Sequence, residues 1–258
     1  SEAEKSDLIN FDGNANTFRL LTHSFRGRRE GGFALTYPTV ASVIKYPRSS
    51  VGTKKFGYFQ QDKETFEEIM QKLQITSLGD KGYVRHPLVY LVEAADDICY
   101  QVMDIEDACR LGILSYDETV EMLCNIFRSD TDVKVFENRD KVFDRVTDKH
   151  ERIAYLRSIV IGRLVCRCSE VFWENRDKIL RGEFSGSLIG GLPKQERVAI
   201  ELISERAKKD IYRHQSVVEI EISGFKIMGT LLDKFIEAIE KPELYYSALL
   251  KPFIPEQY

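Results

Sequence analysis

The chain has 258 residues, of which 43% are hydrophobic and 30% charged, and its formal net charge is −4. This composition is typical of a globular protein. The charge gives no overall case for nucleic-acid binding, and no apolar run is long enough to span a bilayer. The polar start over residues 1–7 does not resemble a signal peptide. We therefore expect a cytoplasmic chain that does not contact a membrane.

Hydrophobic periodicity predicts helices along almost the whole chain. In order, they are expected at residues 14–23, 36–46, 62–73, 87–111, 116–127, 132–145, 149–180, 195–212 and 225–239. Long loops are expected at 24–32 and 47–61, and loops of this length are usually functional or disordered. Alternating aliphatic residues and glutamates at 217–222 are compatible with one short strand. No βαβ alternation occurs, so we predict an all-α fold forming a single helical domain over residues 1–258.

The five cysteines, at positions 99, 109, 124, 166 and 168, lie mostly within helical patterns. An odd number of cysteines in such patterns favours reduced thiols, as found in a cytosol. The spacing of Cys166 and Cys168 is not that of a common zinc site. We therefore interpret all five as structural residues.

The expected helix at 87–111 carries the strongest chemical signal. Asp96, Tyr100 and Asp104 are spaced i, i+4 and i+8, which places them on one side of a helix over about two turns. Ionised carboxylates are costly to bury unless they are paired or bind a metal, so this stripe on a largely apolar helix predicts a polar site inside the protein. Asp96 suits a hard cation, whereas Tyr100 and Asp104 can hydrogen-bond a hydroxylated substrate. The alternative is a solvated helix face with contacts between neighbouring turns.

Basic residues gather after the expected helix at 36–46. Lys45 and Tyr46 end that helix, and Lys54 and Lys55 follow in a loop that contains Gly57. Lysines on such a loop suit a polyphosphate, because an ammonium group is a mobile charge with three donors. A solvated surface loop is the alternative, and we favour it from the loop alone.

Other motifs are weaker. The segment 11–16 opens a helix with a glycine and two asparagines, which predicts either a helix cap or an anion-binding N-terminus. No GxxxxGK[ST] loop occurs, so a P-loop nucleotidase is not supported. The four histidines, at 23, 86, 150 and 214, show no metalloprotease spacing and none is followed by aspartate. No Ser-His-Asp arrangement can be argued from them.

Several blocks, taken in order, resemble one enzyme family. They are Phe11-Asp12-Gly13-Asn14-Ala15 with Phe18-Arg19, Leu35-Thr36-Tyr37, Lys45-Tyr46-Pro47, Lys55-Phe56-Gly57-Tyr58-Phe59, and Arg85-His86-Pro87 leading to Glu93-Ala94-Ala95-Asp96-Asp97-Ile98, Tyr100 and Asp104-Ile105-Glu106-Asp107-Ala108. Together they resemble the deoxynucleoside triphosphate triphosphohydrolases, the dGTPase-like branch of the HD-domain superfamily. The resemblance is strongest from Asn10 to Leu114 and rests on helix pattern after Asp132.

The resemblance implies an all-helical HD-type fold that hydrolyses dGTP or other dNTPs to a deoxynucleoside and inorganic triphosphate. A divalent metal, Mg²⁺ or Mn²⁺, would be held by an H…HD…D ligand set of which Asp96 is the last aspartate. Tyr100 and Asp104 would contact the sugar near its 3′-hydroxyl. The residues that would contact the triphosphate are Asn14, Lys45, Tyr46 and Lys55, with Lys54 as the alternative to Lys55.

The family also tends to form ring-like homo-oligomers, commonly hexamers, and the resemblance extends this expectation to the present chain. The arginines at positions 26, 28 and 29 could then serve a subunit contact or bind a nucleic-acid effector. A solvated loop is the interpretation that we prefer for them.

The chain departs from the family pattern in its metal ligands. It contains no His-Asp dipeptide. In the family, the first histidine, the HD pair and the catalytic acid–base residues precede the Phe-Asp-Gly-Asn block, whereas only ten residues precede Phe11 here. We therefore expect the chain to correspond to the middle and C-terminal part of a member, with its catalytic residues unknown. The alternative function is a non-catalytic nucleotide-binding or regulatory helical module that lacks the HD ligands.

Overall fold

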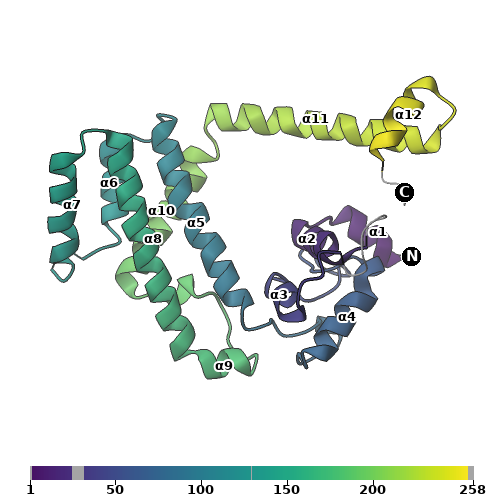
Figure 1. Cartoon of the computed structure of the whole chain (residues 1–258), viewed down its shortest axis with the longest axis horizontal. Coiled ribbons are helices and arrows are strands. Elements are labelled where there is room, and N and C mark those ends of the chain that lie inside the picture. The colour runs from purple at the N-terminus through teal and green to yellow at the C-terminus, as the bar shows by residue number, and fades with distance from the viewer. Residues whose placement is uncertain (1, 25–31, 129, 255–258) are drawn as a thin grey trace.

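The computed structural model describes residues 2–24, 32–128 and 130–254, and these ranges consist of helices joined by loops (Figure 1). No strand occurs within them, so the all-α prediction is confirmed. A π-helical turn, Ala207–Ile211, extends α10. The α-helices are α1 (Glu2–Ile9), α2 (Gly13–Thr22), α3 (Tyr37–Ser42), α4 (Lys63–Lys72), α5 (Val89–Arg110), α6 (Tyr116–Cys124), α7 (Val133–Arg145), α8 (Lys149–Glu174), α9 (Arg176–Leu180), α10 (Lys194–Arg206), α11 (Gln215–Glu240) and α12 (Tyr245–Leu250).

Helices α5 and α8 form the centre of a bundle, with α6 and α10 packed against them. The buried residues of α8 recur every three or four positions from Ile153 to Val171, as expected of an amphipathic helix with one face in the core. Local sequence sets the helix starts. Ser115 and Glu118 form a capping box at α6, and Asp148 accepts a hydrogen bond from the backbone of the first turn of α8.

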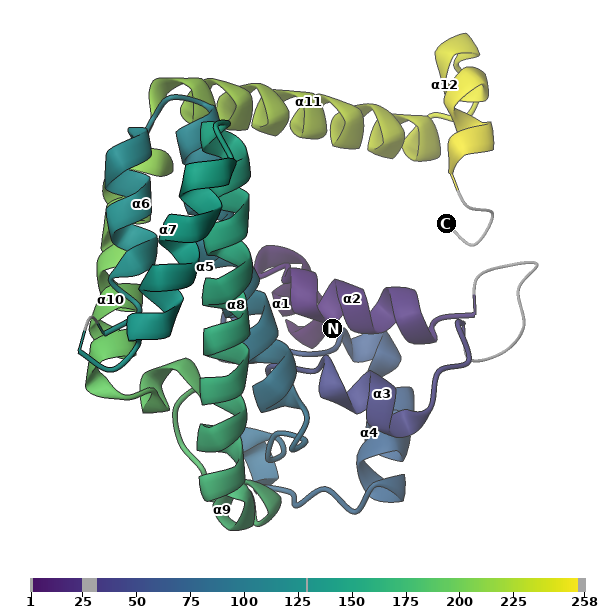
Figure 2. The ribbon, with the colours of Figure 1, turned by 60° about the vertical axis from the view of Figure 1, so that its left-hand side comes forward.

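Helices α2, α3 and α4 gather around a second apolar cluster beside the N-terminal half of α5, and α1 lies next to them (Figures 1 and 2). Its centre is aromatic: the fully buried ring of Phe66 stacks on Tyr58 with 4.1 Å between centroids and meets the edge of Phe18 at 6.0 Å. Through Ile44 and Tyr58, this cluster fixes the segment after α3, which carries Lys45 and Lys55. The assignment of residues 1–258 to a single domain stays a prediction.

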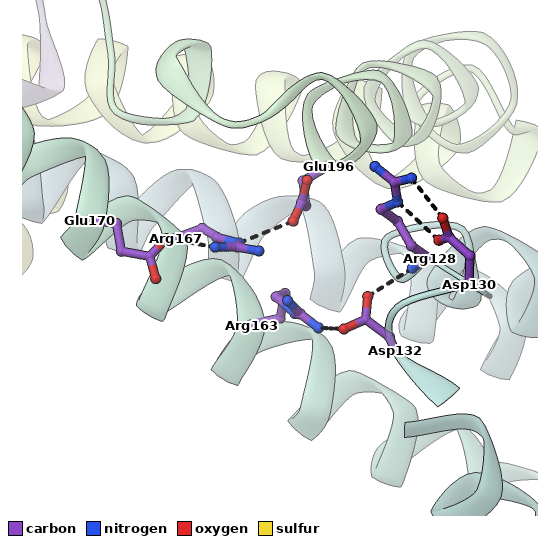
Figure 3. Close-up of polar contacts among 7 residues, drawn as sticks. All are labelled: Arg128, Asp130, Asp132, Arg163, Arg167, Glu170 and Glu196. Atoms are coloured by element: carbon purple, nitrogen blue, oxygen red, sulfur yellow. Dashed lines mark hydrogen bonds and ion pairs between the residues drawn. The ribbon is translucent and has the colours of Figure 1, made fainter. Parts of the chain in front are cut away.

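An ion-pair network joins α8 to α10 and to the loop that precedes α7 (Figure 3). Arg163 pairs with Asp132, whose second oxygen accepts a hydrogen bond from the backbone nitrogen of Arg128 at 2.8 Å. On the next turn of α8, the Nε atom of Arg167 lies 3.1 Å from an oxygen of the buried Glu196 on α10. Each positive group in this network already has a carboxylate partner, so its role is to hold the bundle together.

All five cysteines are free, in agreement with the prediction of reduced thiols. Cys168 is buried in the bundle, and burial raises the pKa of its thiol to about 11. A thiol with so high a pKa stays protonated and unreactive near neutral pH.

The structure corrects several predicted boundaries. The strand proposed at 217–222 is wrong, because these residues lie in the first turns of α11. The helix predicted at 149–180 is interrupted at Asn175, and the one at 36–46 ends at Ser42. Helices α1 and α12 were not predicted at all. Helix α1 lacks a clear apolar face, with Asp7 as its buried residue, so periodicity could not reveal it.

Helix α11 extends away from the bundle as a long arm (Figures 1 and 2). Its polar residues recur every three or four positions from Glu219 to Glu237 and form one polar side, whereas its apolar side is largely exposed, with Phe225 and Met228 84% and 68% exposed. The alternation at 217–222 is therefore the start of an amphipathic helix, in which Glu221 interrupts the apolar side and imitates the period of a strand. Among the described residues, no helix combines the length and apolar character needed to cross a membrane.

Candidate functional site

The stripe of Asp96, Tyr100 and Asp104 lies on the outer side of α5. The buried side of this helix is formed by apolar residues such as Ala94, Ile98 and Val102. Asp96 is exposed, Tyr100 is 58% exposed and Asp104 is half-buried. The expectation that the stripe lies inside the protein is therefore wrong for the described structure. The three side chains nevertheless share one face over about 12 Å, as their spacing predicts.

Tyr212, which follows the π-helical turn, completes the C-terminal part of this stripe. Its hydroxyl donates a hydrogen bond of 2.6 Å to Oδ2 of Asp104, and its ring lies 6.0 Å from that of Tyr100. Burial, together with Asp104 and Tyr100, raises the pKa of Tyr212, so the phenol stays protonated as a donor. Sequence reasoning missed Tyr212 because it lies 108 residues from Asp104 and no local motif connects them.

Asp12 brings Asn14 and Lys55 together. One oxygen of this buried carboxylate accepts hydrogen bonds from the backbone and side-chain nitrogens of Asn14, at 2.8 and 2.7 Å. The other lies 3.4 Å from Nζ of Lys55. Burial alone would raise the pKa of Asp12, but Asn14 and Lys55 outweigh it and the pKa is lowered. Because Lys55, and not the exposed Lys54, pairs with Asp12, the geometry favours Lys55 over Lys54.

The ring of Tyr46 lies between the basic residues. The Nζ atoms of Lys45 and Lys55 are each 6.0 Å from its centroid, the outer limit for a cation–π contact. The loop returns to Tyr46 through Gly57, where a Cβ atom would lie 2.3 Å from the carbonyl oxygen of Tyr46. Only glycine permits that approach. The four residues predicted to contact a triphosphate therefore converge in the structure.

Glu93 connects this basic group to α5. Its two oxygens lie 3.0 Å from Nζ of Lys45 and 3.0 Å from a guanidinium nitrogen of Arg85. Burial alone would lower the pKa of Lys45, but the hydrogen bond and charge of Glu93 outweigh it, and the pKa is raised. Since Glu93 lies about one turn before Asp96, the basic group and the α5 stripe adjoin.

No family model matches the chain. Curated relatives named "Deoxyguanosinetriphosphate triphosphohydrolase-like protein" are 32% identical to it, over 99% of the chain in Synechocystis sp. and over 95% in Listeria monocytogenes. A Yersinia pestis protein named "Deoxyguanosinetriphosphate triphosphohydrolase" is 25% identical over 95% of the chain. The chain belongs to the dGTP triphosphohydrolase-like family. It spans 58%, 52% and 50% of the length of these relatives, respectively.

The described residues of this family member do not form a metal site on their own. No group of three or more histidine, cysteine, aspartate or glutamate side chains within the described ranges is arranged to hold a metal ion. Asp96 is an exposed carboxylate within the sequence block that carries the strongest resemblance. A single carboxylate is too few ligands for Mg²⁺ or Mn²⁺, which need an octahedral set of oxygens.

The loop with arginines at 26, 28 and 29 lies outside the described residues.

Proposed function

We propose that this chain carries the sugar- and triphosphate-binding residues of an enzyme that hydrolyses dGTP or other dNTPs to deoxynucleoside and inorganic triphosphate. Family membership supports the reaction class. The observation that carries the proposal is the convergence of Asn14, Lys45 and Lys55 around Tyr46, next to the α5 stripe. A group of cations followed by a phenol and a carboxylate suits a ligand with a polyphosphate at one end and a hydroxylated sugar at the other.

In this proposal, the basic group binds the triphosphate, which becomes the inorganic product when water attacks the α-phosphorus and the 5′-oxygen leaves with the deoxynucleoside. The ammonium groups of Lys45 and Lys55 neutralise charge that develops on the phosphate oxygens as the bond to the α-phosphorus breaks. Asn14 adds amide donors next to Lys55. Because Asp12 and Glu93 hold these groups before the ligand arrives, less ordering is needed on binding.

The sugar lies against the other part of the stripe. Asp104 accepts a hydrogen bond from the 3′-hydroxyl with the carboxylate orientation that Tyr212 fixes. The rings of Tyr100 and Tyr212 form a wall beside the sugar, and close packing against it would exclude a 2′-hydroxyl. Asp96 is proposed as one ligand of a divalent metal, Mg²⁺ or Mn²⁺, and the described residues do not complete that site.

The proposal is tested by substituting the sugar-binding residues in the intact protein. Asp104→Ala removes a charged acceptor, whose loss typically costs about 1.5–3 kcal/mol, or roughly 10- to 150-fold in kcat/KM. Tyr100→Phe should have a smaller effect. Asp107→Ala is the matched control, because Asp107 is exposed on the same helix. Release of triphosphate from all four dNTPs is measured with Mg²⁺ or Mn²⁺. Unaltered turnover and KM in Asp104→Ala would contradict the sugar role.

The second candidate function is a non-catalytic nucleotide-binding or regulatory module. The absence of a three-ligand metal group from the described residues favours it. The two functions differ in one measurement: a module binds dGTP but releases no triphosphate from any dNTP. Homo-oligomer formation and a nucleic-acid effector remain predictions of the resemblance, and a cytoplasmic location remains a prediction of the composition and the cysteine pattern.

A further inference from the structure

Glu93 occupies a special position between the two parts of the site. It lies in the first turns of α5, its side chain is only 11% exposed, and both oxygens are engaged by cations from outside the helix. One partner, Lys45, belongs to the proposed triphosphate-binding group, and the other, Arg85, does not. Glu93 therefore makes one ion pair within the proposed site, with Lys45, and one outside it, with Arg85.

The ion pair with Arg85 immobilises the carboxylate of Glu93. The guanidinium of Arg85 lies 5.6 Å from the centre of the ring of Tyr90, which is a cation–π distance. Tyr90 is buried in the bundle core, and its hydroxyl donates a 3.0 Å hydrogen bond to the carbonyl oxygen of Phe184. The backbone of Glu93 belongs to α5, and its carboxylate pairs with Arg85, which is itself stacked on Tyr90. The side chain of Glu93 therefore cannot easily rotate away.

The ion pair with Lys45 restrains this flexible side chain at the site. A free lysine side chain loses roughly 2 kcal/mol of rotamer entropy when it is fixed. Against the effect of burial, the hydrogen bond and charge of Glu93 are the strongest interactions that raise the pKa of Lys45 and keep its ammonium group charged. Without Glu93, Lys45 would lose the ion pair that holds it beside Tyr46. Glu93 accepts from one of the three N–H donors of the Lys45 ammonium group. The remaining donors can face a phosphate.

We propose that Glu93 is a positioning residue, which fixes Lys45 for contact with the triphosphate. This inference rests on the proposed function and extends it to a residue that the family resemblance leaves without a role. Glu93 does not itself touch the triphosphate. Its effect on binding passes through Lys45.

The same helix supplies a matched control. Glu106 is 3% exposed and also bridges two cations, Arg110 at 2.7 Å and Arg157 at 2.6 Å. It lies 13 residues further along α5, or about 20 Å, and neither arginine belongs to the site. Glu93→Gln and Glu106→Gln therefore make the same chemical change to the same kind of bridge, one at the site and one away from it.

The experiment measures binding of two probes, inorganic tripolyphosphate and deoxyguanosine, by titration calorimetry. We expect Glu93→Gln to weaken tripolyphosphate binding about 3- to 20-fold, and to leave deoxyguanosine binding unchanged. Glu106→Gln should alter neither affinity. In a Lys45→Met background, Glu93→Gln should cause no further loss of tripolyphosphate affinity, because the residue through which it acts is already absent. Glu93→Asp, which keeps the charge but shortens the side chain, should weaken tripolyphosphate binding too, and it carries the test if Glu93→Gln does not fold.

The outcomes separate this inference from the proposed function. Wild-type affinity in the Glu93 variants, tighter binding of tripolyphosphate, or an equal loss with and without Lys45 would overturn the positioning role and leave the proposed function standing. If the unaltered chain bound neither probe, the proposed function would fail, and the positioning role with it.

Discussion

The two ends of α5 carry the same ionic motif in different surroundings. Glu106, near the C-terminal end, joins α5 to α8 through Arg157, inside a bundle whose core is aliphatic. Glu93, near the N-terminal end, joins α5 to two loops, and one of its partners lies beside an exposed group of cations. Burial and pairing are alike at both ends, so neither identifies a functional carboxylate. What distinguishes Glu93 is the set of further contacts that its partners make.

The largest effect is expected on the buried side of α5, which packs in the bundle core and contributes no residue to the proposed site. Ile105 is fully buried in the bundle core, and Ile105→Ala should destabilise the protein by about 2–5 kcal/mol through lost burial and a cavity. Urea unfolding followed by circular dichroism measures this. The control is Met103→Ala, since Met103 is 43% exposed on the same helix. Equal losses in both variants would mean that α5 does not pack as described.

Glu106→Gln should have the next largest effect, and on stability alone. The change weakens two charge-assisted hydrogen bonds from arginines that are partly exposed, so we expect a loss of about 1–2 kcal/mol. Thermal and urea unfolding measure the loss, and tripolyphosphate titration should show an unchanged affinity. A change in that affinity would remove the distinction between the two ends of α5.

Tyr212→Phe sharpens the comparison within the site. It removes the hydroxyl that fixes Asp104 and should weaken deoxyguanosine binding about 3- to 10-fold, because a charge-assisted hydrogen bond in a half-exposed position is lost. Tripolyphosphate binding should be unaffected, in contrast to the Glu93 variants. Tyr155→Phe, on α8, serves as the control. The prediction fails if Tyr212→Phe weakens both probes equally.

The smallest effect concerns His86, just before α5. Burial lowers the pKa of His86 below its ordinary value of 6.5, and Nδ1 of the neutral ring accepts a hydrogen bond from the backbone of Leu88 at 3.3 Å. As the pH falls below 6.5, the unfolded chain binds a proton that the folded chain resists, so stability decreases over this window. His86→Gln should make the loss of stability between pH 7.5 and pH 5 smaller. Urea unfolding at both pH values measures it, with His150→Gln, at an exposed position, as control.

Local sequence predicted the fold better than it predicted the site. The apolar periodicity of α5 and the proline before it placed that helix within two residues of its observed ends. Caps such as the Ser115–Glu118 pair also depend on residues close in sequence. In α11, however, alternation at 217–222 suggested a strand, because Glu221 interrupts the apolar side of an amphipathic helix in its first turns.

The site depends on contacts between distant segments. Residue types and a family resemblance identified Asn14, Lys45, Tyr46 and Lys55 separately, but only the fold shows that Asp12 and Tyr46 bring them together. Tyr212 reaches Asp104 only because the π-helical turn after α10 returns to α5. Their roles in binding a nucleotide stay predictions.

Helices α8 and α11 have the same length, 26 residues, yet six residues of α8 are buried and only Ala238 of α11 is. The regions of a protein that open most readily are those with few buried contacts. Most helical stability in proteins comes from tertiary packing of an apolar face, and α11 has little of it. Amide hydrogens along α11 should therefore exchange through local opening, while those of α8 exchange only when the bundle unfolds. The chain thus contains two cooperative units of very different stability.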